Sequence, residues 1–258
     1  MNFHIPVTIS IEAQMKAQQA NARTTQVGTG IVLHENGGNV GPIILVFSSF
    51  AFIHSLLASH AAKRFAGRLT GTRYRNGMYR ITFNILSFLQ ITGAIMWLNR
   101  LPDRTLYHVT APLSWIFRTV QLVSVCFALI AAQVVGISKI SGIGNMIRLL
   151  RDEIPSEEPE AQGPPMRDNN MLAAGPFRLT RHPLNLAPIG FFFFFPHMTV
   201  NRATVAVLSL VYLVLGSVHE EIRLRRTYGE AYRRYQTGGI PFYLPISVRT
   251  PFRRPPSR

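Results

Sequence analysis

Five apolar segments constrain most strongly what this chain can fold into. They cover about residues 42–59, 81–98, 112–137, 184–200 and 203–219. A helix needs roughly 20 apolar residues to cross a bilayer core, and the last two segments fall short of that length. Pro188 and Pro196 also interrupt the fourth segment, so we expect these two to form a tight or partly re-entrant hairpin. The sequence therefore predicts an all-α, polytopic membrane protein with about five transmembrane helices, the last two forming a short hairpin.

The basic residues lie on one side of this arrangement. Regions 61–80, 138–182 and 220–258 hold 21 of the 27 Lys and Arg residues, whereas the regions on the opposite side hold five. Cytoplasmic loops carry such an excess in membrane proteins, which places the C-terminus and both ends of the hairpin in the cytosol. The net charge of +15 lies between apolar segments. It therefore favours membrane lipids over nucleic acid as partners.

Composition divides the chain into three parts. Residues 1–40 are polar and resemble a flexible leader, 41–245 form the membrane domain, and 246–258 are a basic tail. Cys126 is the single cysteine, so neither an intrachain disulfide nor a cysteine-rich metal site can form. The histidines lack a metal-ligand spacing, and no metal is predicted.

The segment Gly175–Asn185 changes abruptly from polar to apolar. It reads Gly-Pro-Phe-Arg-Leu-Thr-Arg-His-Pro-Leu-Asn, and proline is favoured in the first turn of a helix. We therefore expect Pro183 to begin the fourth apolar helix, with His182 just before it. The N-terminus of such a helix attracts an anion, and Arg181 reinforces the positive field. The alternative is that Arg-His-Pro only anchors a membrane helix among lipid headgroups.

Glu220 and Glu221 follow directly after the last apolar segment. Carboxylates near a membrane boundary suggest function, although pairing with Arg223 and Arg225 is an equally good interpretation. We expect a basic, amphipathic cytosolic helix to begin at this pair and to reach about Tyr235. Its tyrosines favour packing over a cofactor site. Together the two ends of the hairpin predict a hydrophilic pocket at the cytosolic face.

The order of these motifs resembles a known superfamily. Gly-Pro-Phe-Arg-x-x-Arg-His-Pro, a short hairpin, Glu-Glu, Tyr-Gly-x-x-Tyr-x-x-Tyr and Ile-Pro-Phe-x-x-Pro are similar to the isoprenylcysteine carboxyl methyltransferases and phospholipid methyltransferases. The likeness covers about residues 169–245, the motif-bearing core. The stretches Pro196–Arg202 and His54–Arg64 also resemble the bacterial methanethiol S-methyltransferase branch.

This resemblance implies a membrane methyltransferase that uses S-adenosyl-L-methionine. It further implies a small thiol or a lipid-like acceptor, methylated by in-line transfer, with alignment and exclusion of water as the main sources of catalysis. Two positions depart from the superfamily: Asn185, often Tyr, and Gly216, which is Arg in the isoprenylcysteine branch. By resemblance the cofactor would contact Asn169, Leu172, Phe177, Arg181, His182, Pro183, Leu184, Asn185, Glu220 and Glu221.

Two other functions remain open on the sequence. Sterol reductases, which use NADPH, also resemble the His-Pro and Tyr-Gly-x-x-Tyr pattern. A non-enzymatic membrane accessory protein is the third interpretation, with Arg118 and Gln121 lining a pathway in the third segment. The sequence assigns no catalytic base.

Overall fold

The structure is a computed structural model, and it describes residues 39–157 and 161–243. The predicted leader, except for its last two residues, lies outside the described residues, as does the predicted tail 246–258. The division of the chain into a leader, a membrane domain and a tail therefore stays a prediction.

Four helices are long and apolar enough to cross a membrane, which suggests an integral membrane protein. The fourth apolar segment instead forms the 11-residue helix α7 (Pro183–Phe193), about 16 Å long and so about half of a hydrocarbon core. The prediction of five transmembrane helices is therefore not confirmed. The four long helices are α2 (Val40–Ala58), α3 (His60–Leu98), α4 (Leu113–Val135) and α8 (Val200–Thr237).

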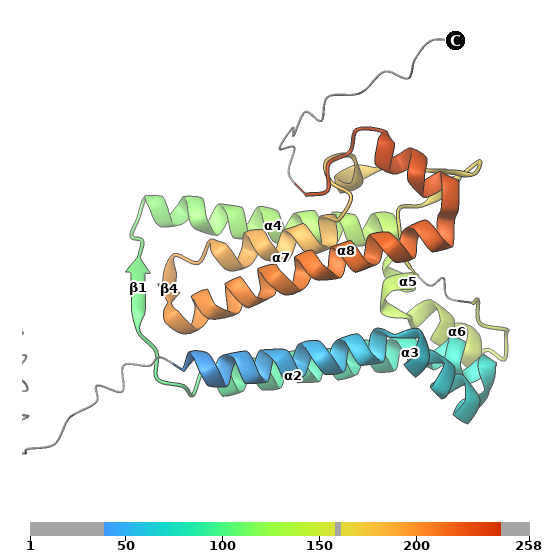
Figure 1. Cartoon of the computed structure of the whole chain (residues 1–258), viewed down its shortest axis with the longest axis horizontal. Coiled ribbons are helices and arrows are strands. Elements are labelled where there is room, and N and C mark those ends of the chain that lie inside the picture. Colours follow the sequence, from blue (N-terminus) through green and yellow to red (C-terminus); the bar gives the residue numbers. More distant parts are fainter. Residues whose placement is uncertain (1–38, 158–160, 244–258) are drawn as a thin grey trace, which may run out of the picture. The chain divides into compact units, whose positions relative to one another are not determined.

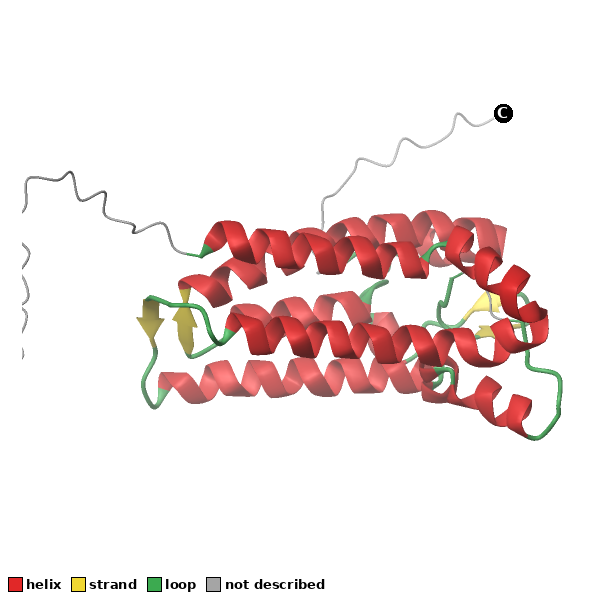
Figure 2. Ribbon diagram, turned by 90° about the horizontal axis from the view of Figure 1, so that it is seen from below, coloured by secondary structure: helices red, strands yellow, loops and turns green. Residues whose placement is uncertain are grey.

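The helices run side by side (Figures 1 and 2). Helix α7 packs against α4 and α8, and α2 packs against α3 and α8. At one end, strand β1 (Thr105–His108) pairs antiparallel with β4 (His197–Thr199), where the chain reverses from α7 into α8. At the other end lie α5 (Ile137–Ser141), α6 (Ile143–Leu150) and the C-terminal part of α8. The start of α7 and the part of α8 around Glu220 thus lie at the same end of the bundle, as the sequence predicts.

The connection between α6 and α7 contains short elements at this second end. Strands β2 (Met166–Arg167) and β3 (Asn170–Met171) form a small hairpin, and the 3₁₀ helix η1 (Gly175–Arg178) follows. Pro183 then begins α7, as predicted from the preference of proline for the first helical turn.

Helices α3 and α8 each contain one non-helical glycine. Gly71 has φ 81° in α3, and Gly229 has φ 53° and ψ −124° in α8. Glycine takes such positive φ values at little cost because it lacks a Cβ atom. The helix boundary that we expected at Glu220 is wrong, since α8 continues through this residue and its direction changes at Gly229. The basic segment is thus a continuation of the last apolar helix.

Much of the apolar surface faces outward. Leu45, Phe52 and Leu122 are 69%, 69% and 64% exposed, respectively. Large contiguous apolar surfaces mark membrane or protein contacts in folded chains. On helices of this length, they fit contact with lipid acyl chains.

The tyrosine stripe of α8 is buried rather than exposed. Tyr232, Tyr235 and Leu224 pack with Met171 of β3 in one apolar cluster, and Tyr228 packs against it. The packing interpretation of the stripe is therefore confirmed. The cluster joins the basic end of α8 to the β2–β3 hairpin and so fixes the segment that leads into α7.

The close contact between α3 and α6 gives the first testable prediction. A Cβ atom at Gly77 would lie 2.9 Å from Cβ of Leu149, whereas a Cβ atom at Gly93 of the same helix meets nothing within 4 Å. Gly77→Ala is expected to destabilise the protein by about 1–3 kcal/mol through overpacking, despite the better helix propensity of alanine. Gly93→Ala is the matched control and is expected to leave stability unchanged or slightly higher. Thermal unfolding in detergent measures both, and equal melting temperatures for the two variants would contradict the prediction.

Candidate functional site

The two ends of the hairpin meet at two carboxylates. His182 lies just before α7, and its ring nitrogens Nδ1 and Nε2 each lie 3.2 Å from a carboxylate oxygen, of Glu220 and of Glu221 respectively. Arg181 donates from Nε to Oε1 of Glu221 over 2.7 Å. The sequence placed these residues at two ends of one hairpin, and the structure brings them into direct contact.

Glu221 is the buried centre of this contact. Its side chain is 11% exposed. Besides Arg181 and His182, Tyr232 donates from its hydroxyl over 3.3 Å, and Gln236 donates to the second carboxylate oxygen. Arg225 lies 3.7 Å away as an i+4 ion pair, as the sequence suggested. A carboxylate with this many partners is held in place.

Glu220 has a different environment. Its side chain is 36% exposed, and one oxygen, Oε2, contacts both His182 and Asn185, the latter over 3.3 Å. Asn185 also donates to Ser217 over 2.8 Å, and Ser217 lies 2.7 Å from the hydroxyl of Tyr243. This chain of polar contacts fixes one carboxylate oxygen and directs the side chain into an adjoining cavity.

The segment after α8 folds back beneath the Arg-His-Pro turn. Thr180 donates from its hydroxyl to the carbonyl of Phe242 over 2.7 Å, and the backbone N–H of Arg181 donates to the carbonyl of Pro241 over 2.9 Å. The ring of Phe242 lies 4.8 Å from that of His182, centroid to centroid. The Ile-Pro-Phe motif therefore covers His182 and removes its side chain from solvent, leaving it 1% exposed.

The two carboxylates favour the charged form of His182. Burial alone lowers the pKa of an imidazole, but hydrogen bonds and charge attraction from Glu220 and Glu221 outweigh it, so the pKa of His182 is raised. Protonated His182 donates from both nitrogens, one to each carboxylate. It acts as a cationic link between a buried and a partly exposed carboxylate.

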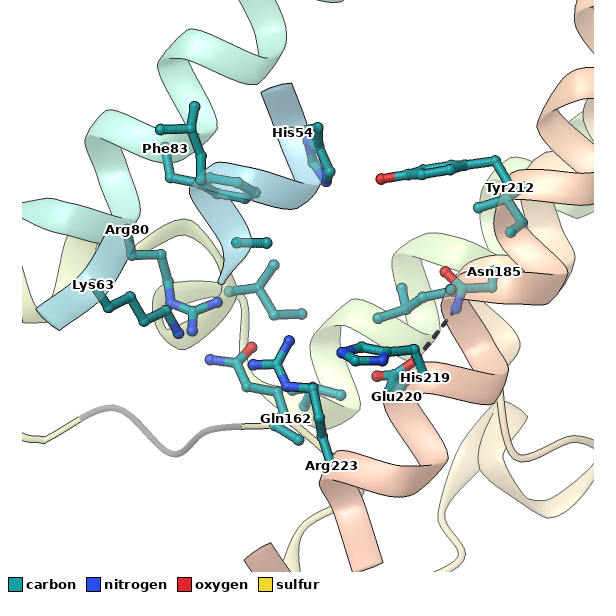
Figure 3. Close-up of a pocket in the computed structure, with 18 of the residues that line it drawn as sticks. His54, Lys63, Arg80, Phe83, Gln162, Asn185, Tyr212, His219, Glu220 and Arg223 are labelled. Atoms are coloured by element: carbon teal, nitrogen blue, oxygen red, sulfur yellow. Dashed lines mark hydrogen bonds between the residues drawn. The ribbon is translucent and has the colours of Figure 1, made fainter. Parts of the chain in front are cut away.

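A cavity of about 400 Å³ opens beside Glu220. Figure 3 shows residues from α2, α3, α7 and α8 around it. Basic side chains face the single carboxylate, and aromatic rings line the side toward α2 and α3. The polar and aromatic lining consists of His54, Lys63, Tyr79, Arg80, Phe83, Gln162, Asn185, Tyr212, His219, Glu220 and Arg223.

A second cavity, of about 440 Å³, lies among α2, α3, α7 and α8 and is almost wholly apolar. Phe47, Phe50, Ile95 and Phe192 are among its lining residues. We call the first space the polar cavity and the second the apolar chamber. His54, Tyr212 and Leu213 line both, so the two spaces adjoin at these residues, which we call the junction.

The residues expected to contact a cofactor fall into three groups. Leu184, Asn185 and Glu220 line the polar cavity. Arg181, His182, Pro183 and Glu221 do not line it; His182 contacts Glu220, and Arg181 and His182 both contact Glu221. Asn169, Leu172 and Phe177 do not line it; Phe177 is buried against α4, and Asn169 accepts from Arg234 through its carbonyl.

Sequence reasoning missed the α2 and α3 side of the cavity. His54, Lys63, Tyr79, Arg80 and Phe83 are far from the motif core in sequence, and the packing of α2 against α8 brings them together. The similarity noted in His54–Arg64 was the available signal.

Arg118 is exposed, and Gln121 donates to the carbonyl of Phe191 over 3.2 Å. Within residues 39–157 and 161–243, no group of three or more His, Cys, Asp or Glu could hold a metal ion; the expectation of no metal stays a prediction.

Comparison with known proteins gives one informative relative. The chain is similar to the methanethiol S-methyltransferase of Pseudomonas deceptionensis. The two are 23% identical over 209 residues, which cover 81% of this chain and 73% of that enzyme. This supports a distant relationship to that branch, as the motifs predicted. No family model and no solved structure matches the chain, so membership of the wider superfamily stays a prediction.

The raised pKa of His182 predicts how stability depends on pH. Its charged form stabilises the fold fully below the ordinary value of 6.5, and this contribution is lost as the pH rises through the raised folded value. His182→Gln should therefore cost about 1–3 kcal/mol near pH 6 and less near pH 9. Melting temperatures in detergent at both pH values measure this. His108→Gln, at an exposed position in β1, is the control; an equal loss for His182→Gln at both pH values would contradict the assignment.

Proposed function

We propose that this protein is a membrane methyltransferase that uses S-adenosylmethionine to methylate a small apolar thiol. The observation that carries the proposal is the polar cavity, with its fixed carboxylate Glu220, adjoining an apolar chamber within the helices. A charged methyl donor and an apolar acceptor need two such spaces in contact. The distant relative named as a methanethiol S-methyltransferase supports the reaction and the acceptor class.

The lining of the polar cavity fits the donor. Its volume of about 400 Å³ falls in the range of small-molecule sites. Glu220 offers an acceptor for ribose hydroxyls or a partner for the cationic groups, and Lys63, Arg80 and Arg223 surround the space with positive charge for the donor's carboxylate. Tyr79 and Phe83 offer aromatic faces for the sulfonium or the adenine.

Around Glu220, the chain's own residues would align the donor and would not supply acid–base chemistry. His182 and Asn185 hold the Glu220 carboxylate, so that it is already positioned before the donor binds. The apolar chamber keeps the acceptor away from bulk water. When bound, S-adenosylmethionine supplies an electrophilic methyl group. By the excess of basic residues, we place this cavity on the cytosolic face.

Binding of the donor is the direct test. Isothermal titration calorimetry of purified protein is expected to detect S-adenosylmethionine and its demethylated product, and no binding of NADPH. Glu220→Gln should weaken binding by about 10- to 100-fold, as expected for loss of a hydrogen bond to a charged group. Arg233→Gln, on the exposed basic face of α8, is the control and should bind normally. Binding of NADPH alone would favour a reductase, and binding of neither would refute the proposal.

Gly216 provides a steric test of the same cavity. It lines the polar cavity on α8, and a Cβ atom there would meet nothing within 4 Å, so a larger side chain fits by filling the cavity. Gly216→Leu is expected to retain the melting temperature and to abolish donor binding. Gly93→Leu, also open at its Cβ but not among the residues that line the polar cavity, should preserve binding. Normal donor affinity in Gly216→Leu would place the donor elsewhere.

Labelled donor added to membranes identifies the acceptor class. Label from the methyl group is expected in a volatile thioether when an alkanethiol is supplied. Label in lipids or in protein instead would retain a methyltransferase but reject the thiol as acceptor.

A further inference from the structure

His54 occupies the junction between the polar cavity and the apolar chamber. It lies on α2 and lines both spaces together with Tyr212 and Leu213 of α8. Figure 3 shows its ring on the cavity side of α2, across from the tyrosine. An apolar acceptor in the chamber can meet a donor in the polar cavity only where the two spaces join. Under the proposed function, a group at this junction would therefore lie beside the reacting atoms.

The imidazole of His54 is oriented by its surroundings. Its Nδ1 lies 3.1 Å from Oγ of Ser87 on α3, so Nε2 is the nitrogen left to exchange a proton. The rings of Phe50 and Phe83 lie 5.4 and 4.9 Å away, centroid to centroid, and Tyr212 lies 6.3 Å away with its ring nearly perpendicular. These neighbours are uncharged side chains, in contrast to the two carboxylates that favour the charged form of His182. A neutral imidazole with one nitrogen fixed has the other available to accept a proton.

Other ionisable groups of the cavity are less suitably placed. His219 lines the polar cavity but not the apolar chamber, and His182 is covered and engaged at both nitrogens. Tyr212 reaches both spaces, but its hydroxyl lies 3.3 Å from that of Ser55, and a phenol with its proton is not a base. Among the described lining residues, His54 alone combines a basic nitrogen with a position at the junction.

A thiol needs such a group, because the thiolate is the reactive nucleophile. We propose that His54 is the general base of the reaction, an assignment that rests on the proposed function and extends it. The proton of the acceptor S–H passes to Nε2 of His54 while the acceptor sulfur forms a bond to the methyl carbon. The bond from that carbon to the sulfonium breaks, and its electron pair stays on the sulfur of S-adenosylhomocysteine. The proton on His54 then passes to water in the polar cavity, and the thioether leaves through the apolar chamber.

Acceptors of different acidity test this role. With an alkanethiol, which is protonated near neutral pH, His54→Asn is expected to reduce the rate of methyl transfer by about 10²- to 10⁴-fold. With thiophenol, a more acidic thiol that is largely ionised, the same variant should lose less than about tenfold, since no base is needed. His108→Asn makes the same chemical change in β1 at the opposite end and should match the wild type with both thiols. Equal losses of His54→Asn with the two thiols, or no loss with either, would overturn the assignment.

Two further measurements separate chemistry from folding. Calorimetry should give His54→Asn an affinity for S-adenosylmethionine within about threefold of the wild type, roughly 0.6 kcal/mol, because its task concerns the acceptor. His54→Gly should regain alkanethiol methylation when imidazole is added, as an external base enters the vacated volume. Absence of rescue in a variant that still binds the donor would contradict the role of a base.

Chemical footprinting tests whether the acceptor binds beside His54, without requiring methyl transfer. Diethyl pyrocarbonate modifies accessible imidazoles, and mass spectrometry locates the modification. An apolar thioether is expected to slow modification of His54 but not of His108, and unchanged modification of His54 would remove the acceptor from the junction. These outcomes are distinguishable from failure of the proposed function, in which the wild type binds no donor and methylates neither thiol.

Discussion

The buried carboxylate of Glu221 is the interaction on which the arrangement of the site depends. It joins α8 to the turn before α7 through Arg181 and His182, and to the end of α8 through Tyr232 and Gln236. Removing one partner from a buried ion pair leaves an uncompensated charge, which costs about 3–5 kcal/mol. Because neighbouring residues on a helix point about 100° apart, fixing Glu221 inward also fixes the direction of Glu220. The adjacent carboxylates thus divide two tasks, one holding the helix and the other facing the cavity.

The sequence predicted the parts of this site that local chemistry determines. Pro183 begins its helix because proline fits the first turn, and the tyrosines of α8 pack because they recur on one helical face. The sequence also placed the Arg-His-Pro turn and the Glu pair at the same end, because the hairpin returns the chain there. It predicted a pocket between them, whereas the structure has a direct contact with the cavity beside Glu220. The boundary expected at Glu220 failed for a local reason as well. A change from apolar to charged residues ends the membrane-compatible part of a helix, but the backbone hydrogen bonds continue until Gly229.

The other wall of the cavity could not be predicted in this way. His54, Lys63, Arg80 and Phe83 belong to α2 and α3. Helix α2 packs against both α3 and α8, and α8 follows it by more than 100 residues of chain. No periodicity within either segment distinguishes a side chain facing lipid from one facing a cavity. The apolar chamber has the same origin, since its lining is drawn from four helices and reads in sequence as ordinary membrane-spanning residues.

The apolar surroundings of the junction explain why a neutral base suits this position better than a charged group. A lysine or carboxylate at the position of His54 would be costly to keep charged among Phe50, Phe83 and Tyr212, and would shift toward its neutral form. An imidazole is stable there as a neutral ring and becomes charged only when it takes a proton. The negative charge then forming on the acceptor sulfur lies beside that new positive charge and is cancelled as the sulfur bonds to the methyl carbon. No lasting charge therefore has to enter the apolar chamber, and a thioether can leave by the same apolar route that the thiol entered.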